Sequence, residues 1–172
     1  MPQSKIISTT GSEIVSVSDA KSFIRIDTSD DDTLLLNMIK QARIWCENYI
    51  GKDIVAKSRQ YYKEIANGRF EIPFAPIASI TSVTVENEAV TYETYGLYDD
   101  IIEISTLGNH KDIIVSYTTS GQDDPLLQQA ILQFVSTLYD NRADFVVMQG
   151  VSFVEIPANV EHILAPLKNA FI

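Results

Sequence analysis

Residues 125–139, PLLQQAILQFVSTLY, carry no charged side chain, and this stretch constrains the fold more than any other. Its apolar residues recur in pairs every four residues, which is typical of a helix whose apolar stripe covers about half of its circumference. The opposite face is polar yet uncharged, and such a face tolerates burial against a neighbour better than a charged one. The apolar stripe consists of Leu126, Leu127, Ala130, Ile131, Phe134, Val135, Leu138 and Tyr139, and the uncharged face of Gln128, Gln129, Gln133, Ser136 and Thr137.

Both ends of this helix carry recognisable signals. Asp123 or Asp124 can accept a backbone N–H of the first turn, and Pro125 fits the first helical position because the N–H that proline lacks is unpaired there anyway. At the other end, Asn141 predicts a helix stop, and Arg142 would lie near the negative end of the helix dipole. The helix is too short and too polar on its second face to cross a membrane, so we expect it to pack on the long helix of its own domain and on a neighbour.

Two helices are predicted ahead of it and one behind. The phrase SVSDAKSFIRI predicts a short helix in which the hydroxyl of Ser18 accepts a backbone N–H of the first turn. The stretch DDTLLLNMIKQARIWCENYI predicts a longer helix, which begins among aspartates, as the helix dipole favours, and stops at Gly51. After the uncharged helix come a strand-like run, FVVMQGVSFV, a break at Pro157 and a closing helix that Pro166 kinks or ends.

Between these helices the apolar period changes to two, which predicts antiparallel strands. Glu86, Asn87 and Glu88 mark a hairpin turn, and Pro73 and Pro76 restrict their stretch to an edge or a bend because proline cannot donate to a strand ladder. The chain is therefore predicted to be an α+β protein. Its 172 residues suit one domain over 1–172, with helices at about 17–25, 31–50, 124–141 and 159–169 and a β-rich insert at about 52–120.

The charge balance argues against one class of function. The chain has 23 acidic residues and 13 Lys and Arg, which gives a net charge of −10. Non-specific binding to nucleic acid or to an anionic membrane requires clustered Lys and Arg that meet phosphates. We therefore expect any contact with DNA to be repulsive or indirect.

Targeting and redox signals are sparse. No stretch reaches the roughly 20 apolar residues of a membrane helix, and the first residues lack the apolar core of a signal peptide. Cys46 is the only cysteine, so no disulfide can form within the chain. Its place on an apolar helix face beside Trp45 predicts a small buried hydrophobe rather than a reactive thiol. These features predict a soluble protein made in a reducing cytoplasm, with no membrane association.

Few residues offer chemistry. His110 and His162 lie far apart in the sequence and lack Cys or Glu partners at metal-ligand spacing. The acidic phrase DTSDDDT, which starts at Asp27, resembles the beginning of a calcium loop, but Asp32 stands where that loop needs glycine. The sequence contains neither a nucleophile motif nor a phosphate-binding glycine loop. We therefore predict no catalytic residues, no metal site, no cofactor and no enzymatic activity.

The tyrosines leave an alternative open. A row of aromatic side chains on a sheet face can hold a sugar or an extended peptide, so the alternative is a monomeric α+β binding module for glycan or peptide. Tyrosine is equally common as a strand former and as an interface residue. Six of the eight tyrosines lie in the strand region: Tyr61, Tyr62, Tyr92, Tyr95, Tyr98 and Tyr117.

Five phrases stand in one order along the chain. VSVSDAKSFIRID leads into DDTLLLNMIKQARIWCENYIGKDI, which ends in a Tyr-x-Gly phrase; PFAPIASITSVTV, PLLQQAILQFVSTLYDNRADF and IPANVEHILAPLK follow. In this order they resemble the head-tail connector (adaptor) proteins of tailed bacteriophages, which form a ring beneath the portal. The third phrase is similar to that family's strand, the fourth to its third helix, which ends in Tyr-Glu-Asn-Arg, and the last to its closing segment. The resemblance runs from about Val15 to Lys168.

The resemblance implies a structural virion protein at the head-tail interface, present in the host cytoplasm during assembly. It implies a helical connector core with an inserted antiparallel sheet, and a homo-oligomeric ring of about twelve subunits with heterologous contacts. Such a ring would dock on the portal protein, extend the DNA channel and meet the next connector ring, a stopper or a tail protein. Duplex DNA would pass without sequence-specific contact, and an acidic channel wall would repel its phosphates.

Two segments are the predicted subunit or portal contacts. One is the uncharged face and polar end of the 124–141 helix. The other is the C-terminal LAPLKNAFI, because an apolar chain end predicts a docked segment rather than a frayed one. The β-rich insert is expected to face the tail or a neighbouring ring. The predicted contact residues are Gln129, Gln133, Tyr139, Asp140, Asn141, Arg142, Leu164, Pro166, Leu167, Phe171 and Ile172.

Overall fold

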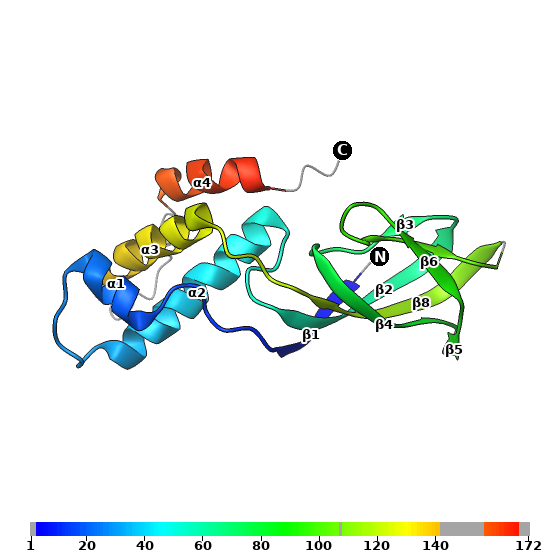
Figure 1. The fold of residues 1–172 in the computed structure, drawn as a ribbon, viewed down its shortest axis with the longest axis horizontal. Coiled ribbons are helices and arrows are strands. Elements are labelled where there is room, and N and C mark those ends of the chain that lie inside the picture. The colour runs from blue at the N-terminus through cyan, green and yellow to red at the C-terminus, as the bar shows by residue number, and fades with distance from the viewer. Residues whose placement is uncertain (1–2, 107, 142–156, 169–172) are drawn as a thin grey trace, which may run out of the picture. The chain divides into compact units, whose positions relative to one another are not determined.

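The computed structural model describes residues 3–106, 108–141 and 157–168 (Figure 1). The chain divides into two compact units, and each consists of segments far apart in the sequence. The strand unit comprises Met1–Ser12 and Val55–Gln122, and the helical unit comprises Glu13–Ile54 and Asp123–Ile172. The chain therefore passes between the units three times.

The helical unit is built around α3 (Pro125–Asp140), the uncharged helix of the sequence. This helix contacts α1 (Val17–Ile24), α2 (Asp32–Ile50) and α4 (Ala158–Leu164), as the ribbon of the unit shows (Figure 1). Its predicted apolar stripe packs into a single core with α2, so the expected packing against the long helix of its own domain is confirmed. The buried side chains that α3 contributes are Leu127, Ala130, Ile131, Phe134, Val135 and Leu138.

Aromatic contacts reinforce the packing of α2 on α3. The ring of Trp45 stacks on Tyr49 at 5.1 Å between centroids and meets Phe134 edge-on at 5.4 Å. Such pairs contribute about 0.5–1.5 kcal/mol beyond the burial of their area. Cys46, one residue along, is fully buried in the same core, which confirms its predicted role as a small hydrophobe.

The helix ends follow their predicted signals with one exception. Asp124 accepts the N–H of Leu126 at the start of α3, and Gly51 ends α2 in the left-handed conformation, with φ 70°. The predicted cap Ser18 is wrong, because the cap of α1 is Ser16. A capping box needs an acid three residues after the serine; Ser16 has Asp19 there, whose carboxylate accepts from the Ser16 N–H at 3.0 Å.

The closing helix ends where its proline predicts. The α-helix α4 stops at Leu164, and a single 3-10 turn, η1 (Ala165–Leu167), carries Pro166. Proline lacks the N–H that would continue the ladder, and this accounts for the change of helix type. The predicted strand-like run FVVMQGVSFV lies outside the described residues.

The strand unit holds two antiparallel sheets. The larger has the order β1-β2-β8-β4-β5 and the smaller the order β3-β7-β6 (Figure 1). An α+β fold with a helical core and an inserted antiparallel sheet is thus confirmed. The strands are β1 (Gln3–Thr9), β2 (Lys57–Asn67), β3 (Phe70–Glu71), β4 (Ile77–Val85), β5 (Glu88–Ala89), β6 (Tyr92–Tyr95), β7 (Ile101–Ile104) and β8 (Asn109–Thr119).

The turn signals of the insert also hold. The β4–β5 hairpin turns at Glu86 and Asn87, both with positive φ, as the sequence predicts. Pro73 and Pro76 lie in the connection between β3 and β4, outside both strands. The carbonyl of Pro73 accepts a 2.8 Å hydrogen bond from the buried Tyr117 hydroxyl, so this bend is tied to the central strand β8.

One strand was not predicted. β1 pairs with β2 through residues that precede the helices, so the sheet begins well before residue 52. All seven of its residues are exposed, and Ile6 and Ile7 are adjacent rather than alternating. A strand that buries neither face shows no period of two, and this explains why the pattern did not reveal it.

Candidate functional site

The predicted contact face of α3 is half-buried and free of charge. Gln128, Gln129, Gln133, Ser136 and Thr137 are all of intermediate exposure in the isolated subunit. Gln128 is held by a 2.6 Å bond from its Nε2 to Asp123, and Thr137 donates to the Gln133 carbonyl at 3.1 Å. An uncharged face of this kind can be covered by another protein surface without burying an unpaired charge.

Gln133 carries an unsatisfied acceptor on this face. Its Oε1 is buried and has no hydrogen-bond partner within the described parts of the chain. A buried polar atom in that state costs about 1–3 kcal/mol. Replacing this acceptor with an apolar atom is therefore expected to recover part of that free energy.

We expect Gln133→Met to stabilise the isolated subunit by about 1 kcal/mol, because the thioether fills a similar volume without a buried acceptor. Urea denaturation of the monomer measures this change. Gln129→Met on the same face is the matched control, with an expected change within about 0.5 kcal/mol, as is usual for surface positions. A destabilised Gln133→Met protein would show that Oε1 is already satisfied in solution.

The polar end of α3 is organised within the subunit. Asn141 ends the helix: its N–H and its side-chain Nδ2 both donate to the Thr137 carbonyl, at 3.1 and 2.8 Å, so the predicted helix stop is confirmed. The Tyr139 hydroxyl donates to the carboxylate of Asp31, and Asp140 is exposed. Arg142 lies outside the described residues.

The C-terminal contact residues fall into three groups. Leu164 is fully buried in the core of the helical unit and is therefore no surface contact in this conformation. Pro166 is exposed, and Leu167 is half-buried against the same core. Phe171 and Ile172 lie outside the described residues.

A buried ion network fixes the geometry of α2. The Arg43 Nε lies 2.7 Å from Glu13 and its Nη1 lies 2.7 Å from Glu47, while the second Glu47 oxygen accepts from the Ile54 N–H at 2.9 Å. Arg43 and Glu47 are 5% and 3% exposed. The network ties the segment before α1, the middle of α2 and the segment after α2 into one framework. Sequence reasoning missed it, because its members are separated by up to 41 positions.

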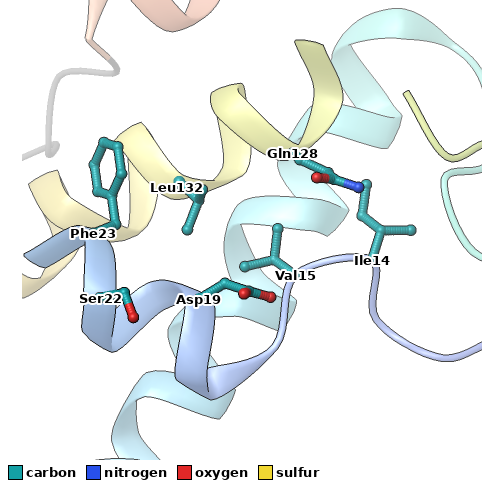
Figure 2. Close-up of a pocket in the computed structure, with 7 residues that line it drawn as sticks. All are labelled: Ile14, Val15, Asp19, Ser22, Phe23, Gln128 and Leu132. Atoms are coloured by element: carbon teal, nitrogen blue, oxygen red, sulfur yellow. The ribbon is translucent and has the colours of Figure 1, made fainter. Parts of the chain in front are cut away.

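A shallow groove between α1 and α3 was also not predicted. Figure 2 shows Phe23 on α1 and Leu132 on α3 lining it together with polar side chains of both helices. Its volume is about 410 Å³. The signal available in the sequence was Phe23 itself, which is 40% exposed on the outer side of a short amphipathic helix. The lining residues are Ile14, Val15, Asp19, Ser22, Phe23, Gln128 and Leu132.

The acidic residues concentrate in the helical unit. By sequence this unit has 14 acidic residues and 7 Lys and Arg, and the strand unit has 9 and 6, so their net charges are −7 and −3. In the acidic phrase between α1 and α2, Asp32 pairs with Lys21 at 2.9 Å, whereas Asp27 and Asp30 are exposed. No group of three acidic, His or Cys side chains in the described ranges is arranged to hold a metal ion.

The single cysteine and the two histidines are the remaining candidates for reactive side chains. Burial, together with the neighbouring Glu47 carboxylate, raises the pKa of the Cys46 thiol to about 12, so the reactive thiolate is suppressed. A ring nitrogen of His110 lies 2.8 Å from the Thr106 carbonyl, and His162 is exposed on α4. Within the described chain, no helix combines the length and the apolar character that membrane crossing demands.

The tyrosines do not form one exposed row. Tyr61 and Tyr117 are buried in the core of the strand unit. Tyr62 neighbours Tyr61 on β2 and therefore points to the opposite face, where it donates to Asp112 at 2.7 Å. Tyr95 donates to Glu93 at 2.7 Å, and hydrogen bonding to Glu93 and Glu103 raises its pKa to about 12. This distribution removes the continuous aromatic face that the binding-module alternative needs.

Comparison with known proteins places the fold. Residues 14–94 match the family model described as phage gp6-like head-tail connector protein, which confirms the resemblance to head-tail connectors over that part of the chain. The third-helix and closing-segment phrases lie beyond the matched range. No curated protein matches the sequence.

Three solved structures share the architecture over nearly the whole chain. A protein in the neck of an empty gene transfer agent (GTA) particle, computed with C6 symmetry, matches with a TM-score of 0.73 and 14% identity, covering 99% of this chain and 97% of that one. A protein in the virion of the native particle matches with a TM-score of 0.70 at 14% identity and the same coverage. A third, from the native neck computed with C12 symmetry, matches with a TM-score of 0.62 at 13% identity, covering 96% and 97%. At these identities the likeness establishes the fold.

Proposed function

We propose that this chain, with its head-tail connector match and the fold of a phage-like neck protein, is a structural subunit of the neck that joins capsid head to tail. In this role it forms a ring that docks on the portal and extends the DNA channel. One observation carries the proposal: the connector-family match covers residues 14–94, and the fold of 99% of the chain follows a protein of a particle neck.

The uncharged face of α3 supports the ring. The matched neck structures were computed with C6 and C12 symmetry, and cyclic contacts are heterologous, so each subunit needs two different adhesive surfaces. Half-buried Gln129 and Gln133 offer one such surface without a charge to desolvate.

The charge distribution supports a channel whose wall does not bind the DNA that passes through it. The helical unit, with a net charge of −7, would repel phosphates if its acidic phrase lined the ring. Exposed Asp27 and Asp30 would contribute most, because neither is among the carboxylates paired with Lys21 or Tyr139. A positive electrostatic potential measured or calculated along the lumen of the assembled ring would refute this part.

Native mass and negative-stain imaging of the purified chain, with and without a portal protein, test the proposal. We expect rings, either free or assembled only on the portal. Gln129→Arg places a charge on the uncharged α3 face and should abolish them, because assembly would bury an unpaired guanidinium. Asn37→Arg, on the exposed side of α2, is the matched control and should assemble normally. A persistent monomer that binds glycan would instead favour the binding module.

A further inference from the structure

The outer edge of β1 has no neighbouring strand in the described part of the chain. All seven of its residues are exposed, including Ile6 at 48% and Ile7 at 57%. Lys5 is its only charge, and it contains no proline. Native proteins usually blunt such edges with charge, proline or a covering segment, because unpaired N–H and C=O groups recruit another strand. β1 therefore offers a template for a strand from outside the subunit.

The opposite edge of the same sheet offers a second template. Among the described residues, β5 pairs only with Thr84 and Val85 of β4, and the next N–H along, that of Val90, bonds to the Val83 carbonyl. Residues 78–82 of β4 have β8 on one side and no strand on the other within the described chain. These five residues are exposed or half-exposed.

The directions of the strands make the two edges compatible. From β1 through β2 and β8 to β4, every neighbouring pair is antiparallel (Figure 1). Across four strands the direction alternates, so β4 runs opposite to β1. A second copy placed beside β4 in the same orientation would present its β1 antiparallel to β4, and the alternation would continue unbroken.

We propose that the large sheet is continuous between neighbouring subunits, with β1 of one copy pairing antiparallel to residues 78–82 of β4 in the next. This inference rests on the proposed ring. Pairing of β1 with a second β1 would be isologous and would stop at a dimer, whereas the β1–β4 contact is heterologous and repeats around a closed ring. When the ring is closed, the outer edge of β1 and the open edge of β4 are both paired in every subunit.

The irregularities of both strands limit which strands can pair with their edges. The pairing of β4 with β8 shifts between Ile77 and Ser79 and again between Ile80 and Ser82, and that of β1 with β2 shifts between Ile6 and Ser8. Bulged edges are poor templates for an arbitrary strand. The contact therefore requires a strand that fits the bulged edge of β4, and the proposal assigns that strand to β1 of another copy.

Disulfide trapping tests the contact in the full chain. Paired variants combine Ser4→Cys or Ile6→Cys with Ser79→Cys or Thr81→Cys, so that the antiparallel registers are sampled. The native Cys46 is fully buried and does not interfere. After mild oxidation of assembled rings, we expect at least one pair to give a ladder of covalent oligomers on a non-reducing gel. Each single variant is the matched control and can give dimers at most.

Hydrogen exchange provides an independent measurement. Amides of residues 3–9 and 78–82 are expected to exchange about tenfold more slowly in the ring than in the monomer. Rings without a ladder from any pair and without slower exchange would overturn the shared sheet and leave the neck function standing. A chain that forms no ring, with or without portal, would overturn both.

Discussion

Arg43→Ala is expected to destabilise the helical unit by about 3–5 kcal/mol, because it removes one cationic partner of the buried Glu47 carboxylate and of half-buried Glu13. Both Glu13 and Glu47 bond to this guanidinium at 2.7 Å, and Glu47 is 3% exposed. Domains of this size have only about 5–15 kcal/mol of stability in total. Urea denaturation followed by circular dichroism should show a transition at markedly lower urea, or a protein already unfolded.

Two further variants separate charge from geometry at this position. Lys40→Ala, at an exposed position one turn earlier on α2, is the matched control and should change stability by less than about 0.5 kcal/mol. Arg43→Lys keeps the charge but lacks the planar fork that reaches both carboxylates, so an intermediate loss is expected. A loss below about 1 kcal/mol for Arg43→Ala would mean that the network contributes little in solution.

Deletion of residues 165–172 is expected to abolish attachment to the portal while the four helices stay folded. The buried residues of the closing helix, Val160 and Leu164, precede the deletion and keep their place in the core. The deletion removes exposed Pro166 and half-buried Leu167, together with the apolar chain end. Co-sedimentation with portal particles measures attachment, and circular dichroism checks the fold.

A shorter deletion locates the determinant. Removal of residues 169–172 alone leaves Leu167 against the helical core. Loss of attachment in both deletion variants would assign portal binding to Phe171 and Ile172. Loss only in the 165–172 deletion would assign portal binding to the turn at Pro166. Normal attachment of the 165–172 deletion would contradict the proposal that this segment binds the portal.

Local signals predicted the helices well. The ends of α3 lie where Asp124, Pro125 and Asn141 predict them, because capping depends on neighbouring residues alone. The prediction of Ser18 as the cap of α1 is wrong because Asp19, the acid that completes the capping box, lies three residues after Ser16.

Features that depend on contacts between distant segments could not be predicted from sequence patterns. The Arg43 network joins two carboxylates, a guanidinium and a backbone N–H from three segments, and no periodicity marks it. The groove at Phe23 exists only because α1 and α3 lie side by side. Leu164 belongs to the C-terminal phrase LAPLKNAFI, which the sequence predicts as a contact segment, and only its packing shows that it belongs to the core.

The position of β8 at the centre of its sheet has a consequence for biosynthesis. β8 ends at Thr119 and is flanked by β2 and β4, so both lack a central partner until that residue has been made. The helical unit likewise waits for α3, which begins at Pro125. Non-local pairing of this kind folds slowly. Neither core can close on a nascent chain that stops before these elements, so such a chain leaves the apolar surfaces of both units exposed.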